Sequence, residues 1–191
     1  MLTHFIIFVV DRFSGQVTSL AHIVNTNKIV KEKLTPRQLE MFKKTVFGRF
    51  VYVAIVFNNP IIHHMLLREV KSTRADSISF SVGKKFITFS NDDFLLITSL
   101  WQSPTRVDQN ESSSYELAIK YFSNRVTKDI LHVRLLEEKY ELEFENDEDV
   151  MKITLVYYKE VAMMGKNKQK NAMDLKRFKD VQNIEYYNSL D

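Results

Sequence analysis

Apolar and polar residues alternate most clearly between positions 77 and 90, and this alternation predicts a β-hairpin. Residues 78–82 alternate apolar side chains with serines, which is the period-two pattern of a strand with one apolar face. Gly83 and Lys84 then interrupt the pattern before a second apolar run. A two-residue turn at this point brings apolar residues of the two strands opposite one another. The expected pairs are Phe80 with Ile87 and Ile78 with Phe89.

Two helix starts carry capping patterns. Thr35, followed by Pro36 and by Gln38 three positions after the cap, predicts a helix that ends at Gly48. Ser90 with Asp93 predicts a second helix that starts directly after the hairpin. The apolar positions along these two helices are Leu39, Phe42 and Val46 in the first, and Phe94, Ile97 and Trp101 in the second.

Helical spacing continues elsewhere along the chain. The most regular helix is predicted over residues 147–164, because three acidic residues at its start complement the helix dipole and Gly165 follows its end. Its expected apolar stripe is Val150, Ile153, Tyr157, Val161 and Met164. Further segments are expected as follows: helices after the Asn59-Pro60 cap and over 115–122, 127–138 and 174–187, a strand over 51–57, and a mobile loop over 102–114.

These elements predict an α+β fold: a mainly helical single domain with a small antiparallel sheet that includes the hairpin near 77–90. The domain is expected to cover residues 13–191. Residues 1–12 contain the apolar run 5–10, which is interpreted either as a buried strand or as an extension set by where the gene prediction begins. The run is too short for a membrane span, which needs about 20 apolar residues, and it lacks the pattern of a signal peptide.

The composition of the chain excludes several kinds of catalytic and binding site. The chain has 191 residues, 45% apolar and 27% charged, and it contains no cysteine. Disulfides, a cysteine nucleophile and cysteine zinc sites are therefore impossible, and an intracellular location is expected. The four glycines are too widely spaced for a phosphate-binding loop.

The adjacent histidines His63 and His64 are the clearest candidates for catalysis or metal binding. Neighbours on a helix point about 100° apart, so the pair cannot ligate one metal ion from that helix. We expect at least one of them to lie near the core. No serine stands in a recognisable catalytic setting, and the acidic run 137–149 reads as solvated surface. The sequence thus predicts a protein that is not an enzyme, with no catalytic, cofactor-binding or metal-binding residues and no evident small-molecule substrate.

Charge and aromatic content suggest two kinds of partner, a nucleic acid and another protein. Basic segments near 28–49 and 166–179 suggest a nucleic-acid-binding module, with Lys166, Lys168 and Lys170 as candidate phosphate contacts. The alternative interpretation of these segments is solvated helix faces and loops. Fourteen Phe residues, Trp101 and the pair Tyr186-Tyr187 are compatible with an interface for an unknown protein partner or with a core.

Ordered motifs resemble a plant family of domains of unknown function, the one numbered nineteen-eighty-five in its series. The similar segments are Phe42-Lys43-Lys44-Thr45-Val46-Phe47-Gly48-Arg49-Phe50, Ile62-His63-His64-Met65-Leu66-Leu67-Arg68-Glu69, residues 89–100, Asp149-Val150-Met151-Lys152-Ile153, Tyr157-Tyr158 and residues 178–188. Together the similar segments span roughly residues 13–188. Ser99 stands where glycine is common in the family. The family usually continues into a Pro-Trp-Gly segment where this chain ends, so the resemblance predicts truncation at the C-terminus.

The resemblance implies an origin and a role. The family is associated with Mutator-like transposable elements whose chains often carry a SUMO-specific (ubiquitin-like) cysteine protease domain. No such domain follows in this sequence, and the family supplies no catalytic residues to transfer. The expectation is therefore a non-catalytic accessory or interaction domain of a plant transposon-derived protein with nuclear residence, and the alternative is the nucleic-acid-binding module.

Overall fold

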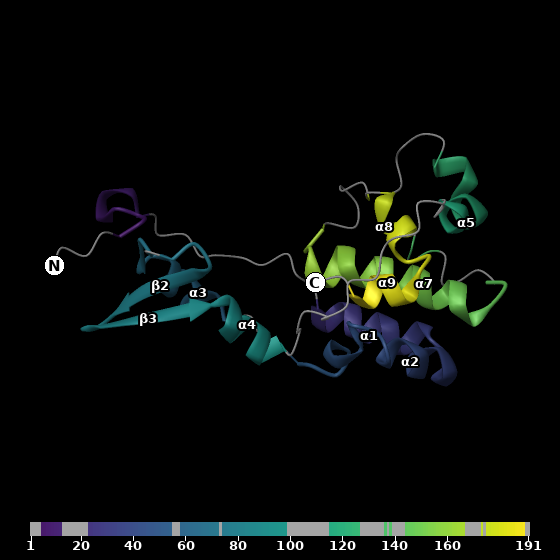
Figure 1. Ribbon diagram of the computed structural model, residues 1–191, viewed down its shortest axis with the longest axis horizontal. Helices are drawn as coiled ribbons and strands as arrows, with labels where there is room; N and C mark the ends of the chain where they lie inside the picture. The colour runs from purple at the N-terminus through teal and green to yellow at the C-terminus, as the bar shows by residue number, and fades with distance from the viewer. Residues whose placement is uncertain are drawn as a thin grey trace. The chain divides into compact units, whose positions relative to one another are not determined.

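The computed structural model describes residues 5–12, 23–54, 58–72, 74–98, 115–126, 136, 138, 144–166, 173 and 175–189. The chain divides into two compact units. The sheet unit comprises Met1–Ser19 and Val56–Trp101, and the helical unit comprises Leu20–Ile55 and Gln102–Asp191. Helices predominate and one small antiparallel sheet is present, so the predicted α+β class is confirmed (Figure 1). The extent of a single domain over residues 13–191 stays a prediction.

The sheet unit is built on the predicted hairpin. Three antiparallel strands, β1 (Glu69–Val70), β2 (Ser77–Val82) and β3 (Lys85–Ser90), follow one another in the order β1-β2-β3. Gly83 in the connecting turn has a φ of 62°, a left-handed conformation that favours glycine. The register confirms the expected pairs of Phe80 with Ile87 and Ile78 with Phe89.

Two short helices flank the strands in sequence. The helix α3 (Asn59–Leu66) is capped by Asn58, whose side chain accepts a hydrogen bond from the Ile61 amide, so the cap lies one residue earlier than predicted. The helix α4 (Asn91–Thr98) begins as predicted. The Ser90 hydroxyl accepts a hydrogen bond from the Asp93 amide, and the Asp93 carboxylate accepts one from the Ser90 amide at 2.8 Å.

The N-terminal apolar run is not the buried strand that we considered. Phe5 makes a single antiparallel bridge to Val70, and the Ile6 amide donates to the Glu69 carbonyl at 3.0 Å. The chain then turns into a short 3-10 helix, η1 (Val9–Asp11). Four side chains of the run are more than half exposed, namely Ile6, Phe8, Val9 and Val10.

The helical unit contains a larger set of elements. They are α1 (Ile23–Lys33), α2 (Pro36–Lys43), η2 (Gly48–Phe50), α5 (Glu116–Val126), α7 (Asp147–Tyr158), the π-helical turn η3 (Lys159–Met163), α8 (Lys176–Asp180) and α9 (Ile184–Ser189). The Thr35–Gln38 capping box is present at the start of α2, as predicted. Asn146 caps α7 through the Asp149 amide at 2.8 Å.

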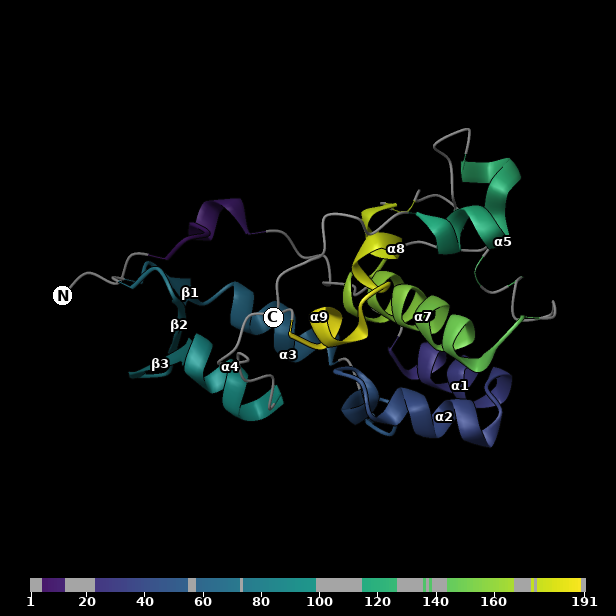
Figure 2. The same cartoon turned by 45° about the vertical axis from the view of Figure 1, so that its right-hand side comes forward.

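The helix α7 is the centre of this unit. All residues from 150 to 158 are buried, so the helix is covered on every side rather than along one stripe. It contacts α2 and α8, and both views show it between α1 and α2 on one side and α8 on the other (Figures 1 and 2). The predicted stripe is buried up to Val161, whereas Met164 is exposed. The hydrophobic core of the described residues lies wholly in this unit.

Three predicted boundaries were wrong. The helix that starts at Pro36 ends at Lys43 instead of Gly48, because the chain folds back so tightly that a Cβ on Gly48 would lie 2.1 Å from the Lys43 carbonyl oxygen. Residues 51–54 form a turn and irregular backbone, not a strand. Residues 174–187 contain two short helices instead of one. The loop predicted over 102–114 lies outside the described residues, as does nearly all of 127–138.

An ionic network joins α5 to the start of α7. The Lys120 ammonium lies 2.7 Å from an Asp149 carboxylate oxygen and 2.6 Å from one of Glu145. The Tyr121 hydroxyl donates to Asp149 at 2.7 Å. Burial works to raise the pKa of Asp149, but Lys120 and Tyr121 outweigh it and hold that pKa below its ordinary value. Asp149 is therefore ionised at neutral pH and ties the two helices together.

One buried polar contact connects α1, α7 and the segment after η2. The Tyr158 hydroxyl donates to the Asn27 side-chain oxygen at 2.8 Å, and the Asn27 amide donates to the carbonyls of Phe50 and Val53 at 2.8 and 3.2 Å. Tyr158 is fully buried and Asn27 is only 4% exposed. All the polar groups of the Asn27 side chain thus find partners inside the protein.

Replacing Tyr158 with Phe should lower the free energy of unfolding by about 1–3 kcal/mol, because the Asn27 oxygen would be buried without a donor. Urea unfolding followed by circular dichroism measures this change. The matched control is Tyr52→Phe, which removes the same hydroxyl from a ring that is 60% exposed. The control should change stability by less than about 0.5 kcal/mol, and equal effects of the two variants would contradict the assignment.

Candidate interaction surface

The hairpin presents an apolar face that the described residues leave uncovered. The register places one set of side chains on this face: Ile78, Phe80, Val82, Ile87 and Phe89. Ile78 is 46% exposed and Ile87 is 49% exposed, and the other three are half-buried. On the opposite face the hydroxyls of Ser79 and Thr88 lie 2.9 Å apart, and Phe86 is 63% exposed.

The helix after the hairpin adds further exposed apolar side chains. No residue of α3, β2, β3 or α4 is buried, and among the described hydrophobic residues of the sheet unit only Val70 is. We define the exposed apolar set as Ile78, Phe86 and Ile87 of the hairpin with Phe94, Leu96 and Ile97 of α4. Single exposed apolar residues are ordinary, but the described part of the sheet unit buries almost no apolar side chain.

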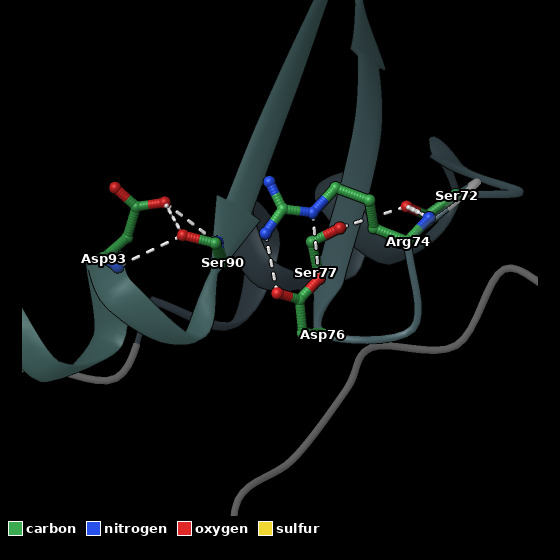
Figure 3. A network of polar contacts seen from close by, with 6 residues as sticks. All are labelled: Ser72, Arg74, Asp76, Ser77, Ser90 and Asp93. Atoms are coloured by element: carbon green, nitrogen blue, oxygen red, sulfur yellow. Dashed lines mark hydrogen bonds and ion pairs between the residues drawn. The ribbon is translucent and has the colours of Figure 1, made fainter. Parts of the chain in front are cut away.

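Polar contacts cluster at the base of the hairpin, around Arg74 and Asp76 and between Ser90 and Asp93 (Figure 3). The Arg74 guanidinium donates to both carboxylate oxygens of Asp76, at 3.0 and 2.6 Å, while the Arg74 amide donates to the Ser72 hydroxyl. The Asp76 carbonyl accepts a hydrogen bond from the Asn91 amide, the first residue of α4. This backbone hydrogen bond links the residue before β2 to the junction between β3 and α4.

The same network contains serines and carboxylates, so it can be tested as a catalytic arrangement. The Ser90 hydroxyl donates to the Asp93 carboxylate at 2.7 Å, and this hydrogen bond lowers the pKa of Asp93. Arg74 likewise lowers the pKa of Asp76. A carboxylate with a lowered pKa is a weak base that does not activate a serine hydroxyl. The arrangement is that of a helix cap and an ion pair.

The histidine pair lies on α3. His63 is half-buried and His64 is exposed, and neither belongs to the buried core, although we expected at least one of them to lie near it. The reason is that α3 packs on a small sheet and buries none of its residues. Among the described residues, no group of three His, Cys, Asp or Glu side chains is placed to hold a metal ion.

Lys166, one of the predicted phosphate contacts, is engaged inside the protein. Its ammonium lies 2.5 Å from a carboxylate oxygen of Glu160, which is fully buried in the π-helical turn η3. Arg177 of α8 lies 3.4 Å from the other Glu160 oxygen. Lys168 and Lys170 lie outside the described residues, so a phosphate-binding loop with these lysines stays a prediction.

Sequence reasoning missed Glu160 as a structural residue. Its position three residues after Tyr157 places it near the apolar stripe of α7, where a carboxylate is expected to be paired if it is buried. That spacing was the available signal. The partner Arg177 comes from a distant helix, and no local pattern indicates it.

A second feature gathers basic side chains around an exposed aromatic ring. The Lys31 and Lys43 ammonium groups lie 4.6 and 5.0 Å from the centre of the Tyr52 ring. Tyr52 also lines an open cavity of about 400 Å³ with Lys28 and Lys31. Two of these lysines also have acidic neighbours, since Lys28 pairs with Glu32 and Lys43 pairs with Glu40. The basic segment 28–49 is thus partly neutralised from within.

No family model, curated protein or solved structure matches the chain. Within the part of the chain that the structure describes, no helix is both long enough and apolar enough to cross a bilayer.

Replacing Lys166 with Ala should lower the free energy of unfolding by roughly 1–3 kcal/mol, because buried Glu160 would lose one of the two cationic partners that the described residues give it. Chemical denaturation measures the change. Lys28→Ala is the control, since Lys28 and Glu32 form an exposed pair at 3.8 Å and its loss should cost less than about 0.5 kcal/mol. A Lys166 variant as stable as the control would show that the Glu160 pair contributes little.

Proposed function

We propose that this chain is a non-catalytic interaction domain that binds another polypeptide through the exposed apolar set of its sheet unit. The observation that carries the proposal is the contrast between the two units. The helical unit buries an extensive core, whereas the described part of the sheet unit buries a single hydrophobic side chain, Val70. A hairpin and a helix whose described residues leave several large apolar side chains exposed are suited to binding.

The energetic basis is the hydrophobic effect. Complete burial of one Ile, Leu or Phe side chain is worth about 1.5–3 kcal/mol. The six members of the exposed apolar set are between 45% and 73% exposed, so a partner that covers them gains roughly half to three-quarters of that amount from each. The hydrogen bond from the Asn91 amide to the Asp76 carbonyl favours binding further, because it links α4 to the chain before β2 in the absence of a partner.

The resemblance to the plant family supports the wider context of this proposal. On that basis the chain is an accessory domain of a transposon-derived, SUMO-protease-associated protein that resides in the nucleus. This part of the proposal rests on the motifs in the sequence, such as residues 42–50 and 89–100. The molecular role proposed in this context is the same: the domain positions or recruits a partner and carries out no chemistry itself.

Panning of a displayed random-peptide library on the purified chain tests the proposed function. We expect selected peptides rich in apolar residues, whose affinity falls at least about tenfold in a Phe94→Ser, Ile97→Ser double variant. The control is Tyr52→Ser, a similar change at an exposed aromatic of the helical unit. Peptides that bind both variants equally, or hydrolase activity that one substitution abolishes, would overturn the proposal.

The second candidate function is nucleic-acid binding, and the Tyr52 site is the observation that favours it. An exposed ring flanked by Lys31 and Lys43 combines a surface for base stacking with cations for phosphates. This site lies in the basic segment 28–49, which was predicted from the sequence.

Titration with labelled single-stranded and duplex DNA at two salt concentrations tests the second candidate. If the Tyr52 site binds nucleic acid, affinity should fall steeply with salt, and Tyr52→Ala with Lys31→Ala should weaken single-strand binding at least about tenfold. Lys71→Ala is the control, because it removes an exposed lysine that lies outside both basic segments. Absence of binding at low salt, or equal loss in the control, would remove this candidate.

A further inference from the structure

The outer edge of β3 is open. In the order β1-β2-β3, the strand β2 is paired on both sides, and the outer edge of β1 receives the Phe5 bridge and the Ile6 amide. Among the described residues, no strand pairs with the outer edge of β3. Natural proteins usually guard such edges with bulges, proline or inward-pointing charges. Residues 85–90 contain no proline and pair with β2 without a bulge, and their one charged residue, Lys85, lies beside the turn at the start of the strand.

The register identifies which backbone groups are free on this edge. The Ser81 amide donates to Arg68 at 2.9 Å, so Ser81 points toward β1, away from β3. Its partner across the hairpin, Phe86, therefore points its own amide and carbonyl outward, and Thr88 does the same two residues later. The Ser90 amide is already bonded to Asp93. Two residues thus offer two donors and two acceptors.

We infer that β3 pairs with β3 of a second copy of this chain. The two strands run antiparallel about a two-fold axis at Ile87, so that Phe86 of each copy pairs with Thr88 of the other and the sheets join into one. This register satisfies all four free groups on each strand. A register centred on Thr88 would instead pair Phe86 with Ser90, whose amide is occupied and whose carbonyl begins α4. The inference rests on the proposed function, because it names the polypeptide that the sheet unit binds.

Side chains on this edge are self-complementary. At the axis, Ile87 of one copy meets Ile87 of the other on the apolar face, where each is 49% exposed alone. Two residues from the axis, Lys85 of one copy faces Phe89 of the other. The exposed Lys84 then lies beside the first turn of the other copy's α4, which carries the exposed Asp92. Basic and acidic ends thus meet at both sides of the axis, as an isologous interface requires.

Sedimentation equilibrium of the full chain tests the inference, and the substitution Thr88→Pro is the first probe. Proline at 88 removes an outward-pointing amide that makes no hydrogen bond within the hairpin. Thr88→Val is the matched control, because it loses the same contact to the Ser79 hydroxyl but keeps the amide. We expect the parent chain to be a dimer. Thr88→Pro should raise the dimer dissociation constant at least about tenfold, and Thr88→Val should change it less than about threefold. A monomeric parent chain, or a dimer indifferent to Thr88→Pro, would overturn the inference.

A charge-swap experiment decides the register even if the proline variant fails to fold. Ile87→Glu and Ile87→Lys each place like charges at the axis, so each variant alone should be monomeric. An equimolar mixture should form a heterodimer, because Glu and Lys would then face each other. Failure of the mixture to associate would overturn the axis at Ile87. If the parent chain is monomeric but still selects peptides that need Phe94 and Ile97, the proposed function stands and only self-pairing falls.

Discussion

The removal of α7 from water is the constraint on which the helical unit depends. A helix with nine consecutive buried residues cannot be stabilised by one amphipathic face, so it needs neighbours all round. The helices α1, α2 and α8 and the side chains of Phe122 and Leu136 supply them. Most of these elements are short, and helices of five to eight residues have little stability in isolation. Their persistence follows from the surface they share with α7.

Burying so much of one helix requires that its polar groups be satisfied inside the protein. Tyr158 does this through Asn27, and Glu160 does it through Lys166 and Arg177. Apolar side chains can pack together in several arrangements, whereas a buried polar group needs its partner in one position. Such contacts therefore make the arrangement of the core more specific. The described part of the sheet unit differs, with polar groups paired at its turns and several large apolar side chains exposed.

Sequence patterns predicted the local structure well where the determining contacts are local. The hairpin register followed from alternation and a two-residue turn, and the caps at Thr35 and Ser90 followed from residues three positions apart. Prediction failed where the local structure depends on contacts that no local sequence pattern indicates. The end of α2 depends on a backbone approach at Gly48, and the fate of residues 51–54 depends on the Asn27 amide, 23 and 26 positions away from the carbonyls it holds.

The candidate site shows the same limit. The residues of the exposed apolar set were visible in the sequence, but a periodic apolar pattern is equally compatible with a face packed in a core and a face exposed to solvent. For Phe94 and Ile97 the pattern pointed to a packed helix face, whereas the structure leaves both exposed. Lys166 was visible as a basic residue, and its buried partner was not. Side-chain identity gives the chemistry available, and only the fold determines what each group contacts.

The π-helical turn at residues 159–163 has a consequence for how this chain can change over evolutionary time. Its Met164 amide bonds the Lys159 carbonyl, five residues back, so the turn holds one residue more than an α-helix would. Deletion of a single residue here would restore regular winding and rotate everything that follows by about 100°. Glu160 and Lys166 would then no longer meet. Lineages of this chain should therefore tolerate length changes at the hairpin tip far more readily than in this turn.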